Sequence, residues 1–205
     1  IPLRLVGSEM CIRDRLKTPD FGDIKRASLS ESTLILISTD SLRNAAYRRS
    51  QFNGQARSIQ QAKSLGQSTI FLSHSHKDHT LALGFAQLLQ DAGCRVYIDW
   101  LDGEMPERPN KETAARIQLK IKENDYFVYL ATENSSKSRW CPWEIGYADG
   151  VKITDRIVIA PTRDRSATYG QEYLGLYRHI DLASDGQLAV FDPNMSNGRY
   201  AKTIW

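Results

Sequence analysis

The chain has 205 residues, of which 41% are hydrophobic and 25% charged, ordinary values for a soluble protein with one full-sized core. Its net charge of +3 is too small to indicate nucleic acid as a partner, because phosphate binders concentrate basic side chains on one face. No apolar run approaches the roughly 20 residues of a membrane-spanning helix, so we expect no membrane segment. Cys11, Cys94 and Cys141 lack the spacing of a metal site or a disulfide framework, and a reduced, cytoplasmic chain is the plain interpretation.

The first fifteen residues follow no pattern of a helix or strand. Residues 6–15 resemble a string that arises when sequencing adapter is translated together with a gene. They also lack the apolar core of a signal peptide. We therefore expect residues 1–15 to be non-native or disordered.

Residues 16–67 are polar and contain few large apolar side chains. Leu42, Ala45 and Ala46 are followed by basic and amide residues, a pattern that favours a surface helix over a strand. The segment has too little apolar surface for a core of its own. It is expected to be a helical extension that packs on the rest of the protein, with a partner-binding arm as the alternative.

From Ser68 onward, short apolar runs alternate with helical patterns. The expected helices cover about 81–93, 111–123 and 139–149. The expected strands are 69–72, 96–98, 126–130, 157–160 and 179–182.

This alternation predicts right-handed crossovers and a parallel sheet, and continuously apolar strands indicate that helices cover both faces. We therefore expect a doubly wound, flavodoxin-like α/β domain with a parallel five-stranded sheet over residues 68–182. The remaining tail, 183–205, receives no assigned role. In such sheets ligands bind beyond the carboxyl ends of the strands, which directs attention to the loops 73–79, 99–110 and 131–140.

The first of these loops contains the polar sequence His74-Ser75-His76-Lys77-Asp78-His79. It matches the H-x-H-x-D-H signature of the metallo-β-lactamase superfamily, in which these residues bind two metal ions. Such a site needs further ligands, and His179 is the one histidine left among the four of the chain. Solvated histidines that begin a helix are the simpler interpretation, so no metal site is expected.

Several other familiar sites are absent from the sequence. There is no phosphate-binding P-loop, no G-x-G-x-x-G after a strand and no G-x-S-x-G nucleophile elbow. A phosphoacceptor receiver domain would need an aspartate after the third strand, where Leu130-Ala131-Thr132 stands instead.

The third loop leads into Ser138-Arg139-Trp140-Cys141-Pro142-Trp143-Glu144. On a helix, Trp140 and Glu144 lie one turn apart and project from the same face. Trp140 could be a core residue and Glu144 a first-turn acid favoured by the helix dipole. Alternatively, the indole stacks on a flat ligand while the carboxylate faces a developing cation. Spacing alone leaves both interpretations open.

Three landmarks in order resemble the TIR (Toll/interleukin-1 receptor) domain family. Phe71-Leu72-Ser73-His74-Ser75 is similar to the motif at the end of its first strand, and Val96-Tyr97-Ile98-Asp99 to the strand that leads into its BB loop. The segment 138–144 is similar to its S-x-W-C-x-x-E signature. The resemblance covers about residues 68–182, and the three motifs together are far more specific than any one of them.

Catalytic TIR domains cleave NAD at the bond between nicotinamide and ribose. The resemblance therefore implies that Glu144 is the catalytic glutamate and that Trp140 helps to form the nicotinamide–ribose pocket. It also implies contacts near the phosphates, the ribose and the BB-loop rim, which would involve His74, Ser75, Asp99 and Trp100. NAD is the substrate, and no separate cofactor is expected.

The resemblance leaves the product open between ADP-ribose, a cyclic isomer and a conjugate. The chain is similar to the TIR proteins of Thoeris anti-phage systems, which make a nucleotide messenger for a separate effector. Self-association through the TIR domain is expected as well. The alternative is a non-catalytic TIR adaptor, which would have no need of both Glu144 and Trp140; a metallo-β-lactamase-like hydrolase ranks third.

Overall fold

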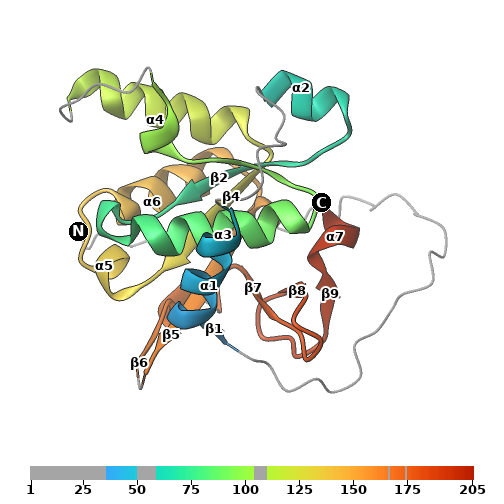
Figure 1. Ribbon diagram of the computed structural model, residues 1–205. Helices are drawn as coiled ribbons and strands as arrows, with labels where there is room; N and C mark the ends of the chain where they lie inside the picture. Colours follow the sequence, from blue (N-terminus) through green and yellow to red (C-terminus); the bar gives the residue numbers. More distant parts are fainter. Residues whose placement is uncertain (1–35, 50–58, 104–109, 166, 174) are drawn as a thin grey trace, which may run out of the picture.

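The computed structural model describes residues 36–49, 59–103, 110–165, 167–173 and 175–205 (Figure 1). The expected features of residues 1–15, Cys11 among them, lie outside this part of the chain. Over the described residues, a nine-stranded sheet runs in the order β3-β2-β4-β5-β7-β8-β9, and β1 and β6 both pair with β5. No helix in the described ranges combines the length and apolar character needed to cross a bilayer.

The five predicted strands form the centre of this sheet. They are β2 (Thr69–Ser73), β3 (Arg95–Tyr97), β4 (Tyr126–Ala131), β5 (Ile157–Asp164) and β7 (Arg178–Leu182). All neighbouring pairs among them are parallel. The prediction of a parallel, flavodoxin-like α/β fold is thus confirmed.

Helices cover both faces of the sheet, as the continuously apolar strands predicted. The longer ones are α3 (His79–Asp91), α4 (Lys111–Glu123) and α6 (Cys141–Val151), and a short α5 (Glu133–Ser136) precedes α6. On one face, Leu72 of β2 packs in a core with Phe85 of α3. On the other face, Phe71 packs with Ile121 of α4 and Ile145 of α6. The alternation along β2 therefore divides the core into two layers.

The polar segment before residue 68 contributes α1 (Thr39–Arg49) and α2 (Ile59–Ser64). Helix α1 lies across α3, and Leu42 is fully buried between them (Figure 1). The same segment also supplies β1 (Ile37–Ser38), which runs parallel to the outer end of β5. That strand was not predicted, because two residues at the end of an apolar run carry no readable periodicity.

The residues after 182 belong to the sheet, although the sequence assigned them no role. Strands β8 (Leu188–Phe191) and β9 (Gly198–Tyr200) extend it antiparallel beyond β7, and α7 (Ala201–Ile204) follows. A Cβ at Gly198 would lie 2.4 Å from the ring of Phe191, so this pairing depends on glycine. Strand β6 (Ala167–Tyr169) forms an antiparallel pair with the end of β5. The predicted set of five strands was correct but incomplete.

Candidate functional site

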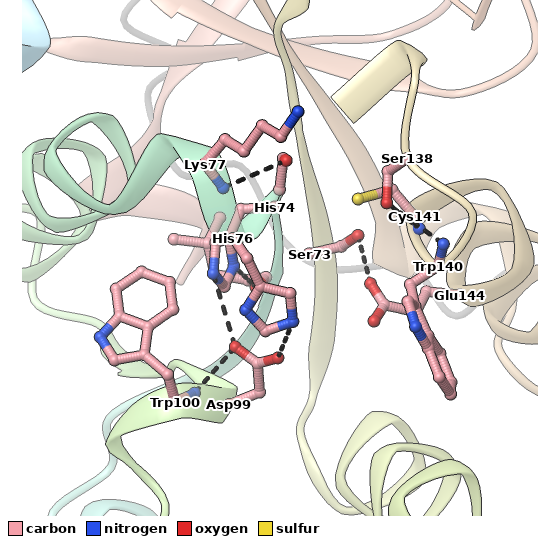
Figure 2. A network of polar contacts seen from close by, with 12 residues as sticks. Ser73, His74, His76, Lys77, Asp99, Trp100, Ser138, Trp140, Cys141 and Glu144 are labelled. Carbon is pink, nitrogen blue, oxygen red and sulfur yellow. Dashed lines mark hydrogen bonds and ion pairs between the residues drawn. The ribbon is translucent and has the colours of Figure 1, made fainter. Parts of the chain in front are cut away.

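The expected site residues lie where β2, β3 and the loop after β4 end (Figure 2). Ser73 is the last residue of β2, Asp99 begins a 3-10 turn directly after β3, and Glu144 lies in the first turn of α6. Residues 104–109 of the predicted second loop lie outside the described part of the chain. The remaining loops meet at the carboxyl edge of the parallel strands, as the topology rule predicts.

The start of α6 fixes the relation between Trp140 and Glu144. The Ser138 hydroxyl accepts hydrogen bonds from the backbone N–H groups of Trp140 at 3.1 Å and Cys141 at 3.3 Å. Pro142 occupies the first turn, where its missing N–H costs nothing. The Glu144 N–H donates to the Trp140 carbonyl at 2.8 Å, so the two residues stand one turn apart, as predicted.

Glu144 is a buried carboxyl group with one close polar partner. Its residue is 5% exposed, and Oε2 accepts a hydrogen bond of 2.6 Å from the Ser73 hydroxyl (Figure 2). Burial raises the pKa of Glu144 to about 8. The hydrogen bond from Ser73 opposes this rise, whereas the negative charge of Asp99 adds to it. A pKa of about 8 leaves this carboxyl group mostly protonated at neutral pH.

Trp140 is half-buried at the start of α6. Its ring meets that of Trp143 edge-on at 5.4 Å, and Trp143 in turn stacks on Tyr147 at 6.1 Å. Both tryptophans pack against the core layer that contains Ile145. An indole that is partly exposed beside a buried carboxyl group has the character required for stacking on a planar ligand.

His74 lies on the other side of Ser73 from Glu144 (Figure 2). Its Nδ1 is 2.9 Å from the Leu72 carbonyl oxygen, and its Nε2 is 3.4 Å from Oδ1 of Asp99. Burial lowers the pKa of His74, while the nearby carboxylate of Asp99 partly compensates. His76 is more exposed, with Nε2 at 3.8 Å from the second oxygen of Asp99.

Trp100 packs against two histidine rings, those of His74 and His79. Its ring lies edge-on to His74, with centroids 4.3 Å apart, and tilted against His79 at the same distance. The backbone N–H of Trp100 donates to Asp99 Oδ1 at 2.9 Å. His74, Asp99 and Trp100 thus form one compact cluster at the end of β3.

Ser75 is placed differently from the other predicted residues. Its hydroxyl accepts a hydrogen bond of 3.3 Å from the Lys77 N–H and thereby caps the 3-10 turn at residues 76–78. Ser73, by contrast, contacts Glu144 directly but was named only as part of a motif. The signal that would have indicated it is a hydroxyl at the last position of a buried strand.

The H-x-H-x-D-H interpretation does not fit the position of its aspartate. Asp78 accepts hydrogen bonds from the Thr132 hydroxyl at 2.5 Å and from the Asn134 amide at 2.6 Å. It therefore ties the end of β4 to the loop after β2 instead of facing His76. Over the residues with described positions, no three His, Cys, Asp or Glu side chains are arranged to hold a metal ion.

Cys94 and Cys141 are free and buried. Burial raises the pKa of each thiol to about 12, which suits packed thiols and not a nucleophile. Cys141 therefore contributes to the core at the start of α6.

The fold is a doubly wound α/β domain, and the tryptophan and the buried glutamate lie at the carboxyl edge of its sheet, where ligands bind in this class of protein. The family model of the TIR domain matches residues 70–192, and the chain belongs to this family.

The names of two relatives state the reaction of those proteins. The chain is 37% identical over 116 residues to "Probable 3' cyclic ADP-D-ribose synthase ThsB'" of Bacillus cereus (strain MSX-D12). This alignment covers 54% of this chain and 59% of that protein. It is 27% identical over 82 residues to "Putative cyclic ADP-D-ribose synthase TIR2" of Cytobacillus dafuensis, which covers 38% of this chain and 22% of that protein. The chain thus spans less than two thirds of the length of these relatives.

Proposed function

We propose that the protein is an NAD-consuming enzyme that breaks the nicotinamide–ribose bond with Glu144 as its catalytic carboxylate and forms a cyclic ADP-ribose-type product. The observation that carries this proposal is the burial of Glu144 beside the half-exposed ring of Trp140. The names of the two relatives as cyclic ADP-D-ribose synthases support the class of product.

The reaction needs a fixed negative charge more than a proton donor. The electrons of the C–N bond leave with the pyridinium nitrogen, so nicotinamide departs neutral and no general acid is required. The ribose is left with oxocarbenium character, which the Glu144 carboxylate stabilises more strongly in the transition state than in the bound substrate. Glycosidases oppose a similar cation with a carboxylate.

The substrate itself favours the active ionisation state of Glu144. NAD carries a positive charge on the nicotinamide ring, and an adjacent positive charge lowers the pKa of a carboxyl group. A pyridinium ring beside Glu144 therefore shifts its carboxyl group from the protonated toward the charged form. Trp140, one turn before Glu144, would stack on that ring.

Capture of the cation determines the product. Attack by the adenine or by a ribose hydroxyl of the same molecule gives a cyclic isomer, and attack by water gives ADP-ribose. A hydroxyl group and a water molecule each release a proton when they attack, and the Glu144 carboxylate can accept it. His74, Asp99 and Trp100, which contact one another after β2 and β3, would bind the remaining parts of NAD. Self-association, a cytoplasmic location and a separate effector reached by the nucleotide product, as in anti-phage signalling, belong to the same proposal.

The test compares the wild type with Glu144→Gln and a control variant, Glu133→Gln. Glu133 lies on the neighbouring helix α5, where it is exposed and pairs with Lys137. Each protein is incubated with NAD without added metal, and the products are separated by chromatography and identified by mass spectrometry. Glu144→Gln should lower nicotinamide release by at least about 10²–10³-fold, with Glu133→Gln unaffected. No release by the wild type at any concentration that permits assembly would favour the adaptor alternative.

A further inference from the structure

Ser73 and Glu144 are joined across 71 positions of the sequence. The Ser73 hydroxyl donates to Glu144 Oε2 at 2.6 Å, and both residues are buried, at 1% and 5% exposure. Ser73 is the last residue of β2 and pairs with Tyr129 of β4, whereas β3 pairs with β2 only as far as Phe71. The pairing with β4 holds its backbone at the carboxyl end of the sheet, from which the hydroxyl reaches the carboxyl group (Figure 2).

The surroundings of Glu144 make this contact important. Among the described residues, no Lys, Arg or His side chain lies within ion-pair distance of its carboxyl group, and the neighbouring charge that acts on it is the negative one of Asp99. A buried carboxylate without a cation or a donor is costly and tends to take up a proton. Ser73 supplies the donor that the charged form needs.

We propose that Ser73 is a positioning residue for Glu144, whose hydroxyl orients the carboxyl group and favours its charged form. The hydrogen bond holds Oε2, and the described residues donate no hydrogen bond to Oε1, which in the proposed reaction would interact with the ribose. This inference rests on the proposed function. It adds a residue that acts on the reaction through Glu144 and needs no contact with the substrate.

The same strand offers a matched control at its opposite end. Thr69 is the first residue of β2, is fully buried, and donates its hydroxyl to Asp125 Oδ2 at 2.7 Å. Thr69→Val removes a hydroxyl–carboxylate hydrogen bond from the same strand at a distance from Glu144. It should lower the stability of the fold without changing how Glu144 titrates.

The experiment compares the wild type, Ser73→Ala, Ser73→Thr and Thr69→Val in two measurements. The first is kcat/KM for nicotinamide release as a function of pH, which reports the essential groups of the free enzyme. The second is a difference infrared titration of the Glu144 carboxyl group, with its signal identified by its loss in Glu144→Gln. Circular dichroism establishes that each variant is folded.

Loss of the Ser73 hydroxyl should raise the pKa of Glu144, because a hydrogen bond to the charged form is removed. Activity falls as Glu144 is protonated, so the acidic limb of the profile should move to higher pH in Ser73→Ala. We expect kcat to fall by about 10- to 100-fold, which corresponds to one hydrogen bond to a charged group. Ser73→Thr keeps the hydroxyl and should restore most of both properties, and Thr69→Val should keep the wild-type profile.

Two negative results are distinguishable. If the pKa of Glu144 is the same in Ser73→Ala as in the wild type, the positioning role of Ser73 is overturned whether or not the enzyme is active. If the wild type releases no nicotinamide, the proposed function fails, and the infrared titration still decides whether Ser73 controls the ionisation of Glu144.

Discussion

Gly84 of α3 lies directly against the backbone of Leu42 in α1. A Cβ atom at Gly84 would stand 1.8 Å from the Leu42 carbonyl oxygen and 2.6 Å from its carbonyl carbon. The two helices can therefore cross at this distance only because position 84 has no side chain. Although the match to the TIR family begins at residue 70, α1 packs on α3 as part of the same core.

Gly84→Ala should consequently destabilise the protein. The clash involves backbone atoms, which cannot rotate away, so α1 must shift and lose packing at a cost of about 1–3 kcal/mol. Denaturation with urea measures this change. Gly146→Ala is the matched control, because Gly146 also lies inside a helix and has no atom within 4 Å of an added Cβ. That variant should gain about 0.5–1 kcal/mol from helix propensity, and an equal response of both variants would contradict the packing argument.

The parallel centre of the fold could be predicted because each strand is a short apolar run between helical patterns. The outer strands could not, because their formation depends on contacts and not on periodicity. Strand β1 has two residues, and β9 pairs with β8 through the contact of Gly198 with the Phe191 ring.

In the candidate site, too, the contacts within one helix could be predicted from the sequence, whereas the contacts between elements could not. Trp140 and Glu144 were predictable as neighbours because their contact is local to one helix. The contact of Ser73 with Glu144 was not, because it depends on how α6 packs against the end of β2. The assigned roles of all six site residues stay predictions, those of Glu144 and Trp140 as well as those of His74, Ser75, Asp99 and Trp100.

The segment that carries Asp99 and Trp100 is anchored by Asp102. Arg116 of α4 binds Asp102 through two hydrogen bonds of 2.9 and 3.0 Å, and the Tyr97 hydroxyl donates to the same carboxylate at 2.8 Å. Arg116→Met should loosen this turn and raise KM for NAD several-fold, with a smaller effect on kcat, because Glu144 is not disturbed. Steady-state kinetics of nicotinamide release separates the two constants.

Lys137→Met provides the control for loss of a cationic side chain. Lys137 pairs with Glu133 on the surface, where such a pair contributes little. Lys137→Met should leave both kcat and KM unchanged. If Arg116→Met changed kcat alone, Asp102 would have no role in binding NAD.

Asp181 of β7 forms a hydrogen bond with the backbone of β1. Its Oδ1 accepts a hydrogen bond of 3.0 Å from the Ile37 N–H, and both residues are fully buried. Asp181→Ala leaves this N–H without a partner and should cost about 1–3 kcal/mol. Hydrogen exchange followed by mass spectrometry should show faster exchange across β1 and α1. Asp181→Asn retains an acceptor oxygen and should retain most of the protection, whereas equal exchange in both variants would show that the charge, and not the acceptor, matters.

Glu144 should make the protein less stable as the pH rises. Its pKa is about 8 in the folded protein and 4.5 as an ordinary value, so the folded state binds a proton between these pH values that the unfolded state has already released. Stability from this group is full below about pH 4.5 and is lost as the pH rises through about 8.

Glu144→Gln removes the charge, so its advantage over the wild type should grow with pH and reach the order of a few kcal/mol. Urea denaturation at a series of pH values from acidic to mildly alkaline measures the difference, with Glu133→Gln as a pH-independent control. Parallel curves for the wild type and Glu144→Gln would show that the pKa of Glu144 is the same in the folded and the unfolded protein. A widening gap would show instead that the fold is destabilised by a carboxylate at position 144, where the proposed reaction needs a negative charge.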